Sequence, residues 1–105
     1  MKNTLKTQGD FQRVYSQKNI IDTRYIRLYS AAAKDTVEKT AVVASKKCGN
    51  AIQRNKAKRR LRALYQQLKK EQILNTPKDL VFIAKKELLT VSFETLYQDI
   101  KGRLS

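Results

Sequence analysis

The feature that most constrains this chain is a stretch of 32 residues, from Lys39 to Lys70, that contains no aspartate or glutamate. It holds eleven of the 23 lysine and arginine residues and therefore carries +11 of the formal net charge of +14. Cations gathered this densely repel one another in a compact protein unless a polyanion neutralises them. We interpret that polyanion as nucleic acid, with a membrane surface or an acidic protein partner as alternatives.

The same stretch has the pattern of an amphipathic helix. Gly49 tolerates the positive φ of a turn and Asn50 is a favourable N-cap, which predicts a helix that begins near Ala51. The segment Asn-Thr-Pro at 75–77 is expected to end this helix. An apolar stripe with helical spacing consists of Ala57, Leu61, Leu64, Tyr65 and Leu68.

The basic residues of this helix form a row. Arg54, Lys58 and Arg62 recur every four residues, so they lie on one side of the helix. An exposed helix face usually mixes charges of both signs, whereas this face has no acid, which favours nucleic-acid contact over an ordinary solvated surface. Asn55 can bridge a phosphate or a hydrated metal ion, or be an ordinary exposed helical residue. The row is flanked by Lys56, Arg59 and Arg60.

The remaining patterns predict an α+β fold, with a small central β-sheet packed with helices in the order α-β-β-α-β-α. At 105 residues without a linker-like segment, the chain is expected to form one domain, residues 1–105. The last strand is almost wholly apolar and should be central, and the second should be covered on both faces. Thr7 and Asp10 have the spacing of a capping box. Strands are expected at residues 23–33, 40–45 and 79–84, and helices at residues 8–17, from Ala51 and after Ser92.

Aromatic side chains indicate a second nucleic-acid surface. In the first strand, Tyr25, Arg27 and Tyr29 alternate onto one face, and because arginine rarely lies in a core, this face is expected to be solvent-exposed. Exposed rings can stack on unpaired bases, each worth about 1–3 kcal/mol. Phe11 and Tyr15, at helical spacing in the preceding helix, can join them. Core packing is the alternative for each ring.

Several absences bear on the chemistry. The chain has no histidine and its nine carboxylates are dispersed, so we expect no catalytic residue and no metal site within the protein. The single cysteine, Cys48, excludes an intramolecular disulfide and is expected to be a small buried residue rather than a reactive thiol. No signal peptide and no membrane-spanning apolar segment are recognised, so the protein is expected to be cytoplasmic, without membrane contact.

Residues 45–62, SKKCGNAIQRNKAKRRLR, resemble the signature of the bacterial ribonuclease P protein subunit. The resemblance extends to LKTQGDFQRVYSQKN as that family's first helix, RYIRLY as its first strand, DLVFIAKK as a later strand, and the C-terminal amphipathic helix. It therefore covers nearly the whole chain.

This resemblance implies a subunit of a ribonucleoprotein that removes the 5′ leader from precursor tRNA. In that family the catalytic RNA subunit holds the Mg2+ ions and performs the hydrolysis. The protein clamps the single-stranded leader in a cleft between its sheet and first helix, while the basic helix faces the RNA subunit. The family also implies a left-handed βαβ crossover, contrary to the usual handedness rule, and a protein that is monomeric on its own.

Carried over to this chain, the resemblance assigns two sets of residues. The leader-binding cleft is lined by Phe11, Tyr15 and Tyr29, and Arg27 adds a phosphate contact where an apolar residue is more usual. The contacts with the RNA subunit are Lys46, Lys47, Arg54, Asn55, Lys56, Lys58, Arg59 and Arg62.

The basic helix departs from the family pattern in three places. Lys56 stands where arginine is frequent, which keeps the charge but loses the bidentate fork. Ala57 and Arg60 replace larger apolar residues, which makes the apolar stripe thinner.

A ribosomal or other structural RNA-binding protein is the main alternative function. A DNA-binding protein is disfavoured because no short helix is expected directly before the basic helix, as a helix-turn-helix arrangement would require. A stand-alone nuclease is disfavoured because the chain has no histidine and no carboxylate cluster.

Overall fold

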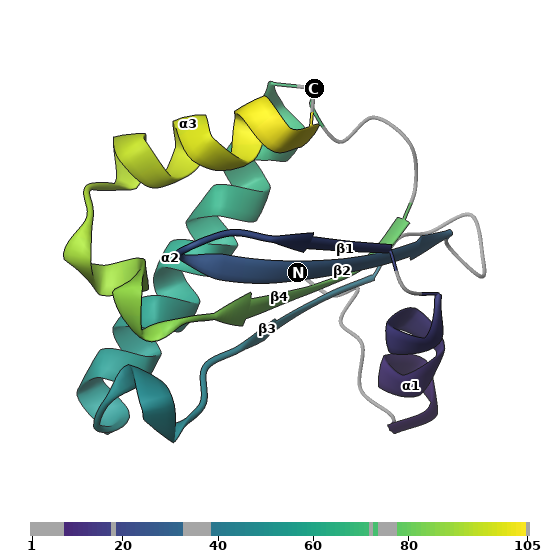
Figure 1. The fold of residues 1–105 in the computed structure, drawn as a ribbon, viewed down its shortest axis with the longest axis horizontal. Helices are drawn as coiled ribbons and strands as arrows, with labels where there is room; N and C mark the ends of the chain where they lie inside the picture. Colours follow the sequence, from purple (N-terminus) through teal and green to yellow (C-terminus); the bar gives the residue numbers. More distant parts are fainter. Residues whose placement is uncertain (1–7, 18, 33–38, 72, 74–77, 105) are drawn as a thin grey trace.

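The computed structural model describes residues 8–17, 19–32, 39–71, 73 and 78–104, and shows a sheet with helices on both faces (Figure 1). The predicted Thr7–Asp10 capping box lies outside what it describes. The helix predicted to end at 75–77 instead ends at Lys70, with Glu71 as its C-cap, and residues 75–77 themselves lie outside the described part. The elements are α1 (Gln8–Ser16), β1 (Asn19–Asp22), β2 (Ile26–Ala32), β3 (Thr40–Val43), the 3-10 helix η1 (Lys46–Cys48), α2 (Ala51–Lys70), β4 (Lys78–Ala84), the 3-10 helix η2 (Lys86–Thr90) and α3 (Phe93–Leu104).

The sheet has four strands in the order β1-β2-β4-β3. β4 pairs antiparallel with β2 and parallel with β3, so the apolar strand is central, as predicted. β3, α2 and β4 form a βαβ unit of adjacent parallel strands; the handedness of its crossover stays a prediction from the family. β3 is an edge strand in which only Ala41 is buried, so the expected burial of both its faces is only partial.

The predicted element order misses one strand. β1 pairs antiparallel with β2, which makes the observed order α-β-β-β-α-β-α. β1 has only four residues, too few for a clear alternating pattern. The first three residues of the predicted strand at 23–33 form the connecting turn instead. The buried Thr23 hydroxyl organises it, accepting hydrogen bonds from the backbone N–H groups of Tyr25 and Ile26, both at 3.1 Å.

The larger core lies between the sheet and the two helices α2 and α3. Ala57, Leu61, Leu64 and Leu68 of α2 are fully buried there, which confirms four members of the predicted stripe. From α3 come Leu96, Tyr97 and Ile100, with Phe93 and Leu104 partly buried, also as predicted. Cys48 belongs to this core, its thiol 3.5 Å from the Ala84 carbonyl oxygen, and burial raises its pKa. It is therefore a buried residue rather than a reactive thiolate.

The start of α2 has the local geometry that the sequence predicts. Asn50 caps the helix by accepting from the Gln53 N–H at 2.9 Å, while Gln53 Oε1 accepts from the Asn50 N–H at 3.0 Å, a complete capping box. Gly49 has a φ of +117°, and a Cβ at this position would lie 1.8 Å from Gln53 Oε1. Glycine is therefore needed both for the turn and for the cap.

A smaller core holds α1 against one end of the opposite sheet face. Val14 of α1 packs on Ala31, Ala41 and Val81. Beside it, Arg13 of α1 makes an ion pair with Asp79 of β4, whose carboxylate is only 1% exposed. The same carboxylate accepts from the backbone N–H of Lys39 at 2.9 Å, and Arg13 also donates to the Ala32 carbonyl at 3.3 Å. This anchor fixes where α1 lies on the sheet.

No helix within the described ranges combines the length and apolar character that crossing a bilayer requires.

We expect Arg13→Ala to lower the free energy of unfolding by about 3 kcal/mol, because it leaves the buried Asp79 carboxylate without its charged partner. Arg103→Ala is the matched control, since its ion pair with Asp99 lies at the surface of α3 and should contribute less than about 1 kcal/mol. Urea denaturation of the two variants measures both values. Equal losses would contradict an anchoring role for Arg13.

Candidate nucleic-acid interface

α1 covers only one end of its sheet face, and aromatic rings line the boundary of the covered part. The Tyr15 and Tyr29 rings meet edge to face with centroids 4.6 Å apart, and Phe11 follows at 6.2 Å from Tyr15. Tyr15 is 37% exposed, and its pKa is raised by partial burial and by the neighbouring Tyr29. The structure thus brings the three predicted cleft aromatics together, with ring surface facing solvent.

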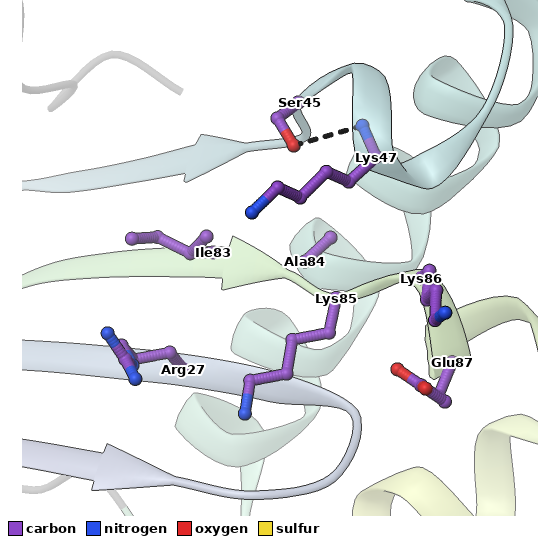
Figure 2. Close-up of a pocket in the computed structure, with 8 residues that line it drawn as sticks. All are labelled: Arg27, Ser45, Lys47, Ile83, Ala84, Lys85, Lys86 and Glu87. Atoms are coloured by element: carbon purple, nitrogen blue, oxygen red, sulfur yellow. Dashed lines mark hydrogen bonds between the residues drawn. The ribbon is translucent and has the colours of Figure 1, made fainter.

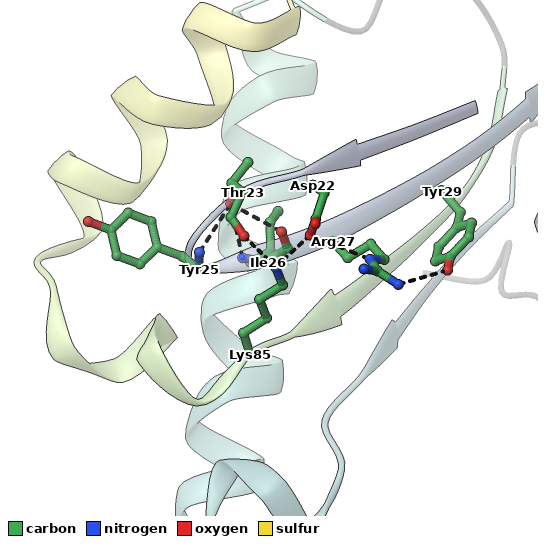
Figure 3. Close-up of polar contacts among 7 residues, drawn as sticks. All are labelled: Asp22, Thr23, Tyr25, Ile26, Arg27, Tyr29 and Lys85. Carbon is green, nitrogen blue, oxygen red and sulfur yellow. Dashed lines mark hydrogen bonds and ion pairs between the residues drawn. The ribbon is translucent and has the colours of Figure 1, made fainter. Parts of the chain in front are cut away.

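Beyond Tyr29, the same face becomes cationic (Figure 3). Arg27 donates to the Tyr29 hydroxyl at 3.4 Å, so the predicted fourth cleft residue joins the aromatic group. The Asp22 carboxylate accepts from Arg27 Nε at 3.4 Å and from Lys85 Nζ at 2.5 Å. Lys85 also donates to the Thr23 carbonyl at 2.6 Å. Hydrogen bonds from Lys85 and Arg27 lower the pKa of Asp22, so this carboxylate is ionised at neutral pH.

A pocket of about 740 Å³ occupies the uncovered end of this face (Figure 2). Its floor is apolar, formed by Ile83 and Ala84 of β4, and its rim carries four cations and one carboxylate. Lys47, which the resemblance groups with the basic helix, instead extends over the sheet toward Ile83 (Figure 2). The lining residues are Arg27, Ser45, Lys47, Ile83, Ala84, Lys85, Lys86 and Glu87.

Lys85, Lys86 and Ser45 were missed as candidate site residues. The signal was present, because two lysines follow directly after the apolar strand that ends at Ala84. A polar pair just past a buried strand lies at the end of the sheet, where a ligand can reach it. Only the position of that strand in the sheet, between β2 and β3, places the pair beside Arg27 and Lys47.

The prediction that Tyr25 shares the face of Arg27 and Tyr29 is wrong. Tyr25 precedes β2, in the turn that Thr23 organises, and strand alternation does not apply to it. Its ring packs against the larger core on the other side of the sheet, and Figure 3 shows it pointing away from Tyr29. It is therefore not part of the candidate site.

On α2, the basic residues separate into different faces. Asn55 and Arg59 are exposed and, at 3.6 residues per turn, point away from the buried Ala57 and Leu61. The same geometry places Lys56 outside the predicted row, on the opposite flank of the helix. The row itself holds the half-buried Arg54 and Lys58 and the exposed Arg62, and the exposed Lys46 precedes the helix in η1.

Arg60 is a structural residue rather than a free cation. Its guanidinium donates to the Leu88 carbonyl at 3.1 Å and to the Val91 carbonyl at 2.5 Å. These bonds tie α2 to η2 and to Val91, which directly follows it. Arg60 stands where the family pattern has a larger apolar residue, and it stabilises the fold there through hydrogen bonds within the protein.

Fold and site together define a small, strongly basic α+β protein with an aromatic and cationic sheet face beside an acid-free helix. The ribonuclease P family model matches residues 1–105. The ribonuclease P protein component of a Nitratiruptor species is 37% identical over 97 residues, covering 92% of this chain and 84% of that protein. That of Bacillus velezensis is 36% identical, covering 89% and 78%. The chain belongs to the ribonuclease P protein family, as the resemblance indicated.

Solved structures agree. The RNase P protein of Staphylococcus aureus superposes with a TM-score of 0.79 at 26% identity, covering 97% of this chain and 92% of that one. The RNase P protein of Thermotoga maritima gives a TM-score of 0.80 at 22% identity, covering 98% and 96%, and this second likeness concerns the fold alone. The predicted fold class, an α+β protein with a small central sheet, is confirmed.

We expect Arg60→Ala to lower the free energy of unfolding by about 1–3 kcal/mol, because it leaves two backbone carbonyls without their donor. The neighbouring Arg59→Ala is the matched control: it removes the same side chain from an exposed position, and stability should change by less than about 0.5 kcal/mol. Thermal denaturation compares the two. A smaller effect at position 60 than at position 59 would exclude the structural role of Arg60.

Proposed function

We propose that this chain assists ribonuclease P in removing the 5′ leader from precursor tRNA, by binding both the catalytic RNA subunit and the leader. The observation that carries the proposal is the presence of two different surfaces on one small domain. One is a cleft with exposed aromatic rings and cations, suited to a single strand; the other is an acid-free helix, suited to a phosphate backbone. We also propose that the protein is monomeric on its own and acts in the cytoplasm.

The leader binds along the sheet face beside α1. Its unpaired bases stack on the rings of Tyr15 and Tyr29, since every base offers a π-face and stacking needs no particular sequence. Its phosphates continue into the pocket, which is lined by Arg27 of β2, Lys47 of η1 and Lys85 from the junction of β4 and η2. The apolar floor at Ile83 packs against sugar or base.

The RNA subunit binds along the solvent side of α2. The exposed residues there provide charge without a competing acid, and Arg59 and Arg62 can each hold a phosphate through the bidentate guanidinium fork. Asn55, between them and the helix start, can donate to a phosphate or to a hydrated ion. This contact is electrostatic and should weaken steeply with salt.

The hydrolysis belongs to the RNA in this proposal. Among the residues that the structure describes, no three His, Cys, Asp or Glu side chains gather in a way that could hold a metal ion. The Mg2+ ions are assigned to the RNA subunit, and the protein contributes positioning and charge.

Reconstitution with a ribonuclease P RNA subunit and a precursor tRNA tests this function. The protein should lower the Mg2+ concentration needed for cleavage at the 5′ end, because its cations replace part of the ionic screening of the phosphates. Replacing both Lys58 and Arg62 by alanine should raise that concentration and make the log–log salt dependence of assembly shallower by about 1.5, while Arg103→Ala, on α3, should leave both unchanged. A protein that binds RNA without altering cleavage would instead be a structural RNA-binding protein.

The cleft has its own test. Tyr29→Ala should weaken binding of precursor tRNA by about 1–2 kcal/mol through lost stacking, whereas mature tRNA, which has no leader, should bind as before. Tyr29→Phe keeps the ring and should retain most of the affinity. Because Tyr29 also packs on the smaller core, a melting curve accompanies each variant. An equal loss for both RNAs would remove Tyr29 from the leader site.

A further inference from the structure

Asp22 introduces a negative charge into the cationic end of the sheet face. It is the last residue of β1 and lies directly opposite Arg27 in the antiparallel register, so both side chains project on the same face. Its side chain is 48% exposed, and one oxygen, Oδ1, contacts both Lys85 Nζ and Arg27 Nε. Asp22 therefore already forms ion pairs with the two cations that a phosphate would use.

Two roles are open to such a carboxylate, and they predict opposite effects of removing it. It can orient the cations for RNA, or it can compete with RNA for them. Orientation by an exposed ion pair contributes little, because both partners are well solvated. Lys85 is moreover held by a second acceptor, the Thr23 carbonyl at 2.6 Å, which stays in place when the carboxylate is removed. A carboxylate and a phosphate that contact the same cations repel each other, and the Thr23 carbonyl does nothing to reduce that repulsion.

We propose that Asp22 is an internal competitor of the leader phosphate at Lys85 and Arg27, and so a residue that sets the affinity of the cleft for the leader. This inference rests on the proposed function. RNA that offers only a phosphate must displace the carboxylate and gains little from doing so. A leader that also stacks on Tyr15 and Tyr29 gains enough to displace it. Asp22 thus lowers the affinity of the cleft for every strand whose phosphate reaches Lys85 and Arg27, the leader included, and a leader binds there because stacking compensates for the competition.

Asp22→Asn tests the competition in the reconstituted holoenzyme. Precursor tRNA should bind about three- to fivefold more tightly at low salt, as expected for removing one like charge near a phosphate. The log–log salt slope should steepen by about 0.7, the coefficient for one further phosphate contact with a single strand. Mature tRNA should bind as before. Asp22→Ser removes the same charge with a different side chain and must give the same result, and melting curves exclude a gain from added stability.

Two controls separate competition from a general change of charge. Glu87→Gln removes a carboxylate from the same pocket, but Glu87 makes no ion pair with Arg27 or Lys85, both of which lie in the described part of the chain. It should tighten binding by less than about 1.5-fold, without a change of slope. Adding Lys85→Gln to Asp22→Asn should abolish most of the gain, because Lys85 is the cation that Asp22 releases.

The outcomes distinguish the two proposals. Weaker or unchanged binding of precursor tRNA by Asp22→Asn, or an equal gain from Glu87→Gln, would overturn the role of Asp22 alone. A wild-type protein without any preference for precursor over mature tRNA would overturn the proposed function and this inference with it. A gain that is specific to precursor tRNA, depends on Lys85 and steepens the salt slope supports the competition.

Discussion

The ion pair between Arg13 and Asp79 is the interaction on which the rest of the site depends. Asp79 lies at the start of the central strand, almost completely buried, and a carboxylate there is costly without a charged partner. Because Arg13 supplies that partner from α1, the helix is fixed over one end of the sheet. The other end stays open, and the exposed edges of Tyr15 and Tyr29 lie at the boundary. An aromatic cleft that continues into a cationic pocket follows from this placement.

The positive charges of the chain are not equivalent once it is folded. Arg60 is committed to two carbonyls between α2 and η2, and Arg13 to a buried carboxylate. Lys85 and Arg27 share a carboxylate that remains accessible to competition. Among the described residues, the solvent side of α2, with Arg59 and Arg62, presents cations without an acidic partner in a helix that has no acid of its own. The formal net charge therefore overstates the charge that is available to a nucleic acid, and the pairing pattern decides where that charge acts.

Local patterns predicted much of this fold because their causes are local. The α2 cap depends on Gly49, Asn50 and Gln53, which are adjacent in the chain, and the apolar stripe of α2 follows from helical spacing. The errors arise where pairing with another segment decides. β1 is too short to be recognised without its partner β2, and Tyr25 lies in the turn that joins these two strands, where strand alternation does not apply. The charge pattern alone places Arg60 on the basic surface, because the carbonyls that bind it lie about 30 residues away in the sequence.

The sequence by itself determined that the chain carries an acid-free basic helix, an apolar central strand and aromatic residues near its start, since these depend only on residue type and spacing. It also contained the motif that identifies the family. Only the tertiary structure decided that Lys47, Lys85 and Arg27 surround one pocket and that Asp22 lies among them. The physical reason is that sheet order and register bring together side chains from β1, β2, β4 and the segment after β3, and no local pattern encodes which strands become neighbours.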